Sequence, residues 1–327
     1  MKNKTKLFLI LAIILMVIFV FFPRQNPQPI HYIDRATGQI KTEKIVSGTA
    51  LYWLYNNPLG KLTLQTIVKR KIVSEFYGWL MHTHWSARKI APFIKTYHID
   101  MSQFQKRDYY SFNDFFIRKL KPGARKIDTA FNVVVSPADG KVFVYQDIAG
   151  QSFIVKGYQF NLKSFLQNDS LAKVYHDGSL LLFRLAPTNY HRFHFPVSGK
   201  LLKIIKIKGD YYSVNPIALK KRIEIFCENK REYQIIESKE FGNVIMAEIG
   251  ATMVGSIVHT FHGTSAVKGE ESGYFQFGGS SIILLFKPGE IKIDADLIKD
   301  TQRHLETSVK VGEPVASING YPEKIRQ

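Results

Sequence analysis

The apolar residues of this chain change their spacing twice, and the changes divide the sequence into three parts. Residues 7–22 form one run without a polar side chain. The apolar positions of residues 48–98 recur at spacings compatible with helices. From about residue 106 short β-prone runs follow one another, mostly without long helical patterns between them. These runs are 133–135, 141–144, 180–183, 204–207, 244–247 and 282–286. The expected fold class is therefore α+β, with an N-terminal helical, membrane-associated part before a mostly antiparallel β domain of residues 106–327.

The apolar run near the N-terminus predicts a membrane-associated segment over residues 1–24. Three lysines precede it, and Pro23 and Arg24 follow it. At about 1.5 Å per residue, a helix of residues 7–22 is about 24 Å long, slightly short for a bilayer core, but its basic flanks can reach the head groups. No small-x-small cleavage site follows, which favours an uncleaved anchor over a cleaved signal or a surface-lying helix. We expect the protein at the cell membrane, either anchored or peripheral. The sequence does not decide on which side of the membrane it lies.

Residues 25–105 are expected to hold a linker and then a helical region. Proline and glutamine mark the linker over residues 25–47. All three tryptophans of the chain, Trp53, Trp79 and Trp85, lie in the helical region among lysines and arginines. Amphipathic helices with this composition are typical of a membrane interface. The alternative is an ordinary helical subdomain with the tryptophans in its core.

Composition narrows the partners of the chain. Its 327 residues include 45 Lys and Arg against 27 Asp and Glu, a formal charge of +18. A hydrophobic content of 45% excludes intrinsic disorder. The single cysteine, Cys227, excludes an internal disulfide framework and a four-cysteine zinc site. The charge favours an anionic partner, either nucleic acid or an acidic membrane. No nucleic-acid-binding motif is present, so we expect a phospholipid membrane and no nucleic acid.

Three segments carry candidate chemistry. Residues 274–286 predict a hairpin with a Gly-Gly turn, in which Ser280 follows Gly279 and could attack its carbonyl carbon. His191 and His194 lie three residues apart and could supply a general base near neutral pH. Asp139 lies in a turn between two β-prone runs, where a carboxylate shapes the turn or orients a histidine.

The histidines also permit a different interpretation. His259 and His262 repeat the spacing of His191 and His194, so the four could be ligands of a metal-dependent hydrolase. Without a third fixed ligand this spacing is a weak signal, and packed histidines are the commonest outcome. A non-catalytic, basic membrane-binding module is the other alternative.

Taken together, these segments resemble the pyruvoyl-dependent phosphatidylserine decarboxylase proenzymes. Residues 279–281 before the apolar run 282–286 resemble the family's self-cleavage motif, and residues 190–196 resemble its Tyr-His-x-x-His-x-Pro block. Residues 137–140 resemble its aspartate segment. Further similar blocks are residues 111–125, 229–232 and 250–257. The resemblance covers roughly residues 32–300, and Ser281 replaces the commoner threonine.

The resemblance implies a mechanism and its residues. Asp139 would orient His194, His194 would deprotonate Ser280, and the chain would be cleaved between Gly279 and Ser280. The covalent pyruvoyl group generated from Ser280 would decarboxylate phosphatidylserine to phosphatidylethanolamine through a Schiff base, without metal or external cofactor. His191 would bind the substrate carboxylate or return the proton, and the two histidines could exchange roles. The large and small chains would remain a heterodimer, with a homo-oligomer possible.

Overall fold

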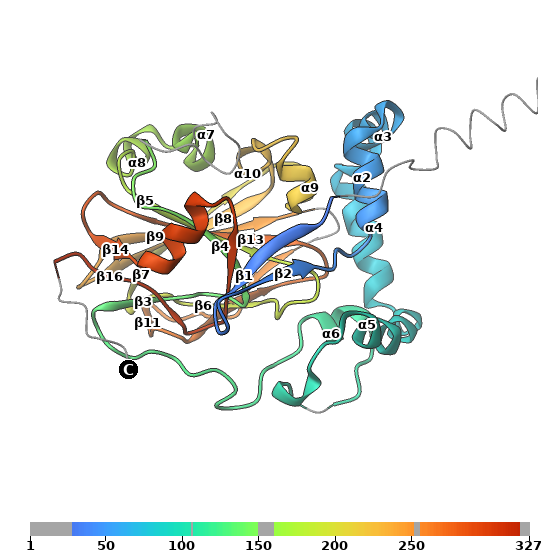
Figure 1. Ribbon diagram of the computed structural model, residues 1–327, viewed down its shortest axis with the longest axis horizontal. Coiled ribbons are helices and arrows are strands. Elements are labelled where there is room, and N and C mark those ends of the chain that lie inside the picture. The colour runs from blue at the N-terminus through green and yellow to red at the C-terminus, as the bar shows by residue number, and fades with distance from the viewer. Residues whose placement is uncertain (1–27, 106, 150–159, 252–255, 321–327) are drawn as a thin grey trace, which may run out of the picture.

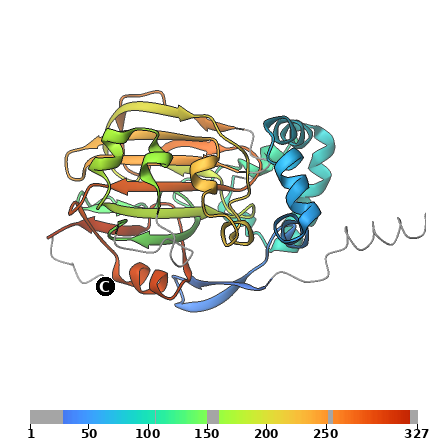
Figure 2. The ribbon, with the colours of Figure 1, turned by 90° about the horizontal axis from the view of Figure 1, so that it is seen from above.

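The computed structural model of this protein describes residues 28–105, 107–149, 160–251 and 256–320. A group of helices from the first third of the described chain lies at one side of a β-rich body (Figures 1 and 2). The predicted anchor of residues 1–24 lies outside the described residues. Within the described ranges, no helix combines the length and apolarity that crossing a bilayer requires.

The helical elements are short. Those before the β-rich body are α2 (Gly48–Asn56), α3 (Pro58–Thr63), the π-helical turn η1 (Leu64–Val68), α4 (Lys71–His82), the 3-10 turn η2 (His84–Lys89), α5 (Ile90–Tyr97), the 3-10 turn η3 (Met101–Gln103) and α6 (Phe112–Phe116). Those within it are α7 (Leu162–Leu166), α8 (Asp169–Val174), α9 (Pro216–Leu219), α10 (Ile225–Glu228) and α11 (Ala295–Gln302).

The strands form one large sheet and two small ones. The ten-stranded main sheet, in spatial order, is β11 (Ser265–Ala266), β7 (Gly199–Ile207), β8 (Arg231–Ser238), β9 (Gly242–Gly250), β13 (Ser280–Phe286), β5 (Ser179–Leu185), β4 (Gly140–Tyr145), β15 (Glu306–Val309), β1 (Ile30–Asp34) and β2 (Gln39–Glu43). One small sheet is β10 (Ile257–His259), β12 (Glu271–Phe275) and β6 (Arg192–His194). The other is β14 (Ile291–Ile293), β16 (Pro314–Ile318) and β3 (Val133–Val135).

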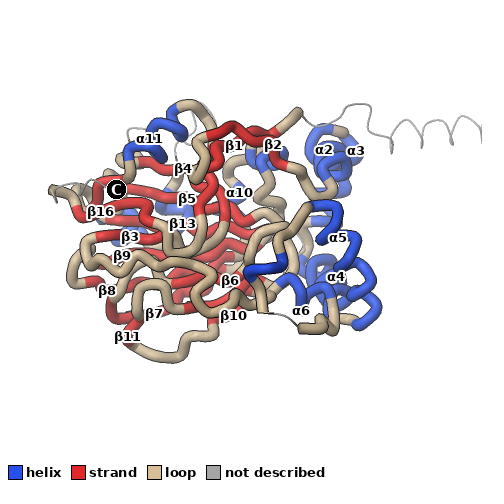
Figure 3. The backbone as a smooth tube through the Cα atoms, turned by 60° about the horizontal axis from the view of Figure 1, so that its bottom comes forward, coloured by secondary structure: helices blue, strands red, loops and turns tan. Residues whose placement is uncertain are grey.

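The six β-prone runs read from the sequence all lie in strands, so the expectation of a β-rich domain is confirmed. Among the named strands of the described chain, β1 and β15 form the one parallel pair, and the other pairs are antiparallel. This antiparallel pairing confirms the α+β class, together with the separation of the N-terminal helices from the strands that Figure 3 shows.

Each face of the main sheet is covered by different elements. On one face, Leu182, Ile245 and Ile283 pack against the helices α2 and α7–α10 in one core. On the other face, Ile282 and Leu284 pack against both small sheets and α11 in a second core. Alternate residues of β13 therefore enter different cores, because successive side chains of a strand point to opposite faces.

The hairpin expected over residues 274–286 is wrong. β12 pairs with β10 and β6, whereas β13 pairs with β9 and β5, so the two strands belong to different sheets. Both edges of β13 are occupied by its neighbours in the main sheet, which leaves no edge for β12. The Gly-Gly segment is therefore a crossing between two layers, and residues 275–277 do not pair with residues 282–286.

Residues 25–47 contain more structure than the predicted linker. The strands β1 and β2 pair along five residues each and extend the main sheet. Arg184 of β5 binds both Glu43 of β2 (2.6 Å) and Glu306 of β15 (2.5 Å), and Lys141 lies 3.3 Å from Glu43. This buried ionic cluster attaches the hairpin to strands far away in the sequence, which explains why local polarity did not reveal it.

The N-terminal helices are attached to the β-rich body by polar contacts. The Tyr55 hydroxyl accepts a hydrogen bond from the Ser213 amide (3.0 Å), and Lys69 forms an ion pair with Asp210 (2.8 Å). Trp79 and Trp85 are 61% and 58% exposed, so these two tryptophans are not core residues. The ordinary-subdomain interpretation therefore fails for both of them.

Candidate active site

Ser280 is the first residue of the central strand β13. Its register partners are Leu185 on β5 and Gly250 on β9, so the bond from Gly279 to Ser280 lies where the chain enters the main sheet. The Ser280 side chain is completely buried, and its hydroxyl oxygen has no hydrogen-bond partner. Buried polar atoms in folded proteins are nearly always paired, so an unpaired hydroxyl at this position requires a functional explanation.

The Ser280 side chain points toward the layer that carries the candidate histidines. It lies on the same face of β13 as Ile282, which packs against β6 and β12 in the second core. Ser281 lies on the opposite face, beside Arg184 on the neighbouring strand. Its hydroxyl is also buried and unpaired. Of the two serines, only Ser280 therefore lies on the face of β13 toward the layer of β6 and β12.

The helix α6 fixes the segment immediately before the bond. The Phe277 amide donates to the Asn113 side-chain oxygen (2.8 Å), and the Phe277 ring lies 5.1 Å from the Phe116 ring. The next residue, Gly278, has a φ of 141°, a positive angle that a residue with a side chain rarely adopts. A Cβ on Gly279 would meet Val214 at 3.6 Å, an ordinary contact, so the bond itself is not crowded.

His191 joins this aromatic cluster. Its ring lies 3.9 Å from the Phe116 ring, and its Nδ1 donates to the Asn189 carbonyl oxygen (3.0 Å). Its Nε2 is buried and has no partner. Burial lowers the pKa of His191 to about 3, and the neighbouring Arg118 charge acts in the same direction. At neutral pH His191 is therefore an uncharged imidazole with one free acceptor nitrogen.

Both ring nitrogens of His194 are occupied. Nδ1 lies 2.9 Å from the Gly269 carbonyl oxygen, and Nε2 lies 3.2 Å from the Tyr190 hydroxyl. Burial lowers the pKa of His194, while the nearby charges of Glu271 and Asp139 oppose this shift. The His194 ring adjoins a cavity of about 230 Å³, which is also lined by Arg125 and Glu271. Arg192 adds to the decrease, so the pKa of both histidines is lowered, and only His194 has carboxylates nearby that offset part of the shift.

Asp139 lies beside His194 without a hydrogen bond to its ring. The turn that contains Asp139 contacts His194 through the backbone, where the His194 amide donates to the Pro137 carbonyl oxygen (2.8 Å). The Asp139 carboxylate accepts hydrogen bonds from the Arg125 side chain (3.0 and 2.5 Å) and from the Val311 amide (2.9 Å). Asp139 therefore affects His194 by its charge rather than by direct contact.

The two histidines, His191 just before β6 and His194 at its end, lie at different positions along the neighbouring strand β12. The Phe275 amide donates to the His191 carbonyl oxygen (2.9 Å), whereas the register partner of His194 is Glu271. At about 3.3 Å per residue, His194 lies about 10 Å farther than His191 from the end of β12 that leads to Ser280. The structure thus brings His191 to the cleavage-site end of β12, and places Asp139 beside His194.

Comparison with known proteins agrees with the resemblance read from the motifs. Residues 112–317 match the family model described as phosphatidylserine decarboxylase. This chain belongs to the phosphatidylserine decarboxylase family. A phosphatidylserine decarboxylase proenzyme of Fusobacterium nucleatum is 52% identical over 292 residues, which cover 88% of this chain and 97% of the relative. Proenzymes of Clostridium botulinum strain Kyoto and of Desulfitobacterium hafniense strain DCB-2 are 46% and 43% identical, with 88% of this chain covered in each case and 99% and 97% of the relatives.

The family is one of decarboxylases, and the relatives named above are described as proenzymes. Several residues around the site received no role from the sequence. Asn113, Phe116, Arg118 and Arg125 all lie within the block of residues 111–125, which resembled the family without indicating a function. Their contacts with Phe277, His191, the loop of residues 188–189 and Asp139 join separate segments of the chain, so only the fold reveals them.

The hydrolase alternative finds no support in this decarboxylase fold. Across the described ranges, no group of three or more His, Cys, Asp or Glu side chains is arranged to hold a metal ion. His259 instead lies 3.2 Å from the Glu232 carboxylate, on β10, with β12 between it and the strand of His194. The four histidines thus do not form one ligand set.

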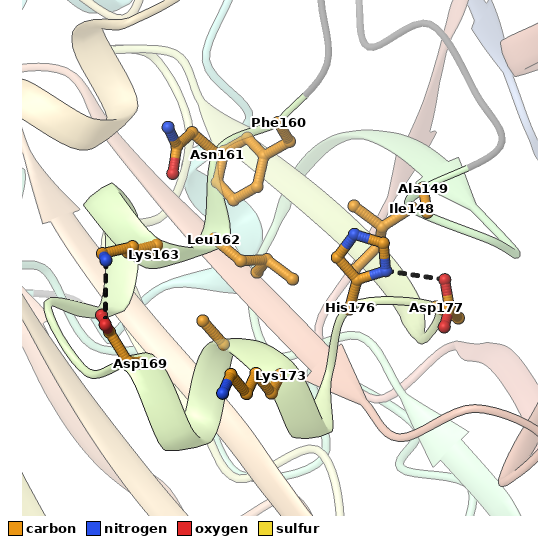
Figure 4. Close-up of a pocket in the computed structure, with 11 residues that line it drawn as sticks. Ile148, Ala149, Phe160, Asn161, Leu162, Lys163, Asp169, Lys173, His176 and Asp177 are labelled. Carbon is orange, nitrogen blue, oxygen red and sulfur yellow. Dashed lines mark hydrogen bonds and ion pairs between the residues drawn. The ribbon is translucent and has the colours of Figure 1, made fainter.

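A larger cavity of about 860 Å³ lies apart from the candidate residues (Figure 4). Its walls come from α7, α8 and the neighbouring segments, with an ion pair between Lys163 and Asp169 and a contact between His176 and Asp177. None of the catalytic candidates lines it. Cavity size therefore does not locate the chemistry in this chain.

Proposed function

We propose that this protein is a phosphatidylserine decarboxylase that cleaves its own chain between Gly279 and Ser280 and turns Ser280 into a pyruvoyl group. The observation that carries the proposal is the buried, unpaired Ser280 hydroxyl at the first position of β13, on the face toward the layer of β6 and β12. The description of the relatives as proenzymes supports it further. The product would be phosphatidylethanolamine.

The proposed cleavage begins with proton removal from Ser280. The Ser280 oxygen attacks the Gly279 carbonyl carbon, and the bond from that carbon to the Ser280 nitrogen breaks as the nitrogen takes up a proton. The resulting ester then loses the Ser280 α-proton, and the bond between Cβ and Oγ of Ser280 breaks, so that Oγ leaves as part of the Gly279 carboxylate. Water converts the remaining dehydroalanine to a pyruvoyl group and releases ammonia.

The electrostatics of the site favour different roles for the two histidines. We assign the base to His194, where Asp139 and Glu271 offset part of the decrease in pKa that burial and Arg192 cause. A proton reaching its Nε2 has to displace or pass through the Tyr190 hydroxyl, the partner of that nitrogen. We assign His191 the role of a neutral acceptor, whose free Nε2 receives a hydrogen bond from the reacting group.

The residues present fit the group that the family implies. Ser280 provides its atoms, and the unpaired Nε2 of His191 provides an unused acceptor in the same aromatic surroundings. When formed, the pyruvoyl group supplies a conjugated carbonyl that accepts the electrons released with carbon dioxide. The rings of Phe116 and Phe277 exclude water beside His191, which favours conversion of a carboxylate into neutral carbon dioxide.

Intact mass and a denaturing gel of the purified protein test the proposal. We expect a large chain ending at Gly279 and a small chain beginning at position 280, blocked to Edman chemistry and with the mass of a pyruvoyl terminus. The Ser280→Ala variant should give one full-length band. A full-length band for the parent protein, unchanged over days at neutral pH, would favour the non-catalytic membrane-binding alternative.

We further propose that the helices before the β-rich body dock on an anionic phospholipid bilayer. A set of large apolar side chains there is 40–74% exposed. They are Leu59, Leu62, Ile67, Ile72, Phe76, Trp79, Trp85 and Tyr110. Exposed cations lie between them in the sequence, and Lys89 lies 5.6 Å from the Trp85 ring. Aromatic rings with cations suit the interface of a membrane that contains phosphatidylserine.

Vesicle binding of the full chain tests the docking surface. Phe76→Ser with Trp79→Ser should reduce binding to phosphatidylserine-containing vesicles more than Val174→Ser with Leu202→Ser, a control pair that is also exposed but lies on α8 and β7. Binding should also weaken as salt rises, because exposed charges are screened. Equal binding to anionic and neutral vesicles by a chain lacking residues 1–24 would contradict the proposal.

A further inference from the structure

Arg118 is a buried cation that has no carboxylate within ion-pair distance among the described residues, although the charge of Asp139 acts on it from farther away. It follows α6 directly, is 2% exposed, and forms no ion pair with any described residue. Its guanidinium lies 4.4 Å from the Phe104 ring and 4.7 Å from the Phe115 ring. Burial lowers the pKa of Arg118 to about 10, so the group stays charged at neutral pH. Burying a charge without a counter-ion costs free energy, so a buried arginine at this position is expected to have a specific role.

Of the described hydrogen bonds of Arg118, one goes from Nη1 to the Phe115 carbonyl oxygen (3.4 Å), and the other two reach the loop that holds His191. Its Nη2 donates to the carbonyl oxygens of Thr188 (3.0 Å) and Asn189 (3.1 Å). The same Asn189 oxygen lies 3.0 Å from Nδ1 of His191. One carbonyl thus connects the buried cation to the imidazole.

This shared carbonyl determines which nitrogen of His191 carries the proton. A carbonyl oxygen only accepts hydrogen bonds, so Nδ1 must donate and must be protonated. In the neutral ring the proton on Nδ1 leaves Nε2 as an acceptor. By donating to the oxygens of Thr188 and Asn189, Arg118 fixes the orientation of the Asn189 carbonyl, and with it the acceptor that Nδ1 meets. The free, buried Nε2 is the consequence.

We infer that Arg118 is a positioning residue, which acts through the Asn189 carbonyl to hold His191 in the tautomer with a proton on Nδ1 and an open Nε2. This inference deepens the proposed function, on which its catalytic meaning rests. Arg118 itself touches neither Ser280 nor the reacting bond in any contact described above. Its effect on the reaction passes through the orientation and tautomer of one ring.

A purely structural role for a buried arginine has a matched example in the same chain. Arg231 is also completely buried, and its guanidinium lies 5.3 Å from the Phe165 ring. It donates at 2.7–2.9 Å to the carbonyl oxygens of Ser164, Phe165, Cys227 and Asn229. Burial lowers its pKa to about 10 as well. No described hydrogen bond connects these carbonyls to a histidine, so Arg231 controls for burial, charge and carbonyl binding.

The tautomer of His191 can be measured without any catalysis. The full chain with Ser280→Ala, which keeps position 280 uncleaved, is labelled with ¹⁵N-histidine, and His191→Gln identifies the signal. We expect Nδ1 to be protonated and Nε2 unprotonated in the parent. Arg118→Met should shift both ¹⁵N signals toward a mixture of tautomers, and Arg231→Met should not. Unchanged His191 signals in a folded Arg118→Met chain would overturn the inference.

Cleavage of the Ser280 chain gives the second readout. Arg118→Lys keeps a positive charge but cannot bridge two carbonyl oxygens as a planar fork does, and should slow cleavage or decarboxylation by about 10–100-fold, a common cost of losing an orienting partner. Arg231→Lys, at equal stability, should slow it less than twofold. Equal decreases in the rate for both variants would show that Arg118 has only a structural role. A parent chain that never cleaves would contradict the proposed function, while the tautomer measurement would still decide this inference.

Discussion

At the scale of single residues, the adjacent Ser280 and Ser281 allow a hydroxyl that is proposed to react to be compared with one that is only buried. Ser280 and Ser281 both have buried hydroxyl groups without partners, but they point to opposite faces of β13. Only Ser280 faces the layer of β6 and β12. Their identical chemistry and different surroundings make them an internal comparison for the role of position.

Ser281→Ala is therefore expected to leave cleavage within about twofold of the parent, whereas Ser280→Ala abolishes it. The free energy of unfolding of Ser281→Ala should stay equal or rise by about 1 kcal/mol, because the variant removes an unpaired buried hydroxyl. Denaturing gels and urea unfolding measure the two quantities. Loss of cleavage in a stable Ser281→Ala chain would place the second serine in the chemistry.

A buried carboxyl group near the site predicts how stability depends on pH. Glu248 is fully buried on β9, its register neighbour on β8 is Glu232, and burial raises its pKa to about 8. Gln234 donates to one of its oxygens (2.7 Å), and the other has no partner. Between pH 4.5 and 8 the folded chain therefore binds a proton at Glu248 that the unfolded chain has released.

Because the folded state binds the extra proton, the contribution of Glu248 to stability falls as pH rises through that window, by at most about 1.4 kcal/mol per pH unit. The Glu248→Gln variant should lose this dependence and gain stability over the parent at pH 8 relative to pH 5. Urea unfolding at the two pH values measures the difference. Parallel stability curves for both chains would show that Glu248 stays ionised.

At the scale of elements, the crossing from β12 to β13 positions the bond that is proposed to break. Gly278 has a positive φ, whereas Gly279 has room for a Cβ. Gly278→Ala should lower the free energy of unfolding by about 1–3 kcal/mol, the usual cost of strain at such an angle. Gly279→Ala should cost less than about 1 kcal/mol. Urea unfolding in the Ser280→Ala background compares them, and equal costs would contradict this account of the crossing.

The sequence predicted those elements whose signal is local. Runs such as 180–183 and 282–286 are buried on both faces, so continuous apolar residues marked them as strands. The polar hairpin of β1 and β2 was not predicted, because its partners Arg184 and Glu306 lie far away along the chain. The Gly-Gly segment was misread for a related reason, since pattern alone does not distinguish a turn within one sheet from a passage between two.

The residues of the candidate site were also predictable, because local motifs mark them. The motifs identified Asp139, His191, His194 and Ser280, and the family they indicate is confirmed. Their division of roles was not predictable, because it depends on neighbours such as Arg118. A backbone carbonyl shared between two side chains leaves no trace in a sequence.

At the scale of the whole molecule, the proposed cleavage would cut a chain whose two parts share one sheet. The segment after Ser280 supplies β13 and β15 to the main sheet, and β14, β16 and α11 to the second core. All seven residues of β13 are buried between β9 and β5. Separation of the two chains would therefore require unfolding of the body.

We expect both chains to elute together in size-exclusion chromatography after complete cleavage, and to separate only in denaturant. Their unfolding should be one cooperative transition followed by either chain's fluorescence, since both cores draw on both chains. Mass analysis of the eluted peak checks the first point. Release of the small chain under native conditions would contradict the central placement of β13.

The burial of β13 also sets an order of events in the life of the molecule. The strand can take its place only while the body assembles, so folding has to come first and the cut second. Every mature enzyme would then keep the small chain with which it was synthesised, and mixing two populations would exchange nothing between them. A damaged small chain could not be replaced by another, so its damage would inactivate that molecule permanently.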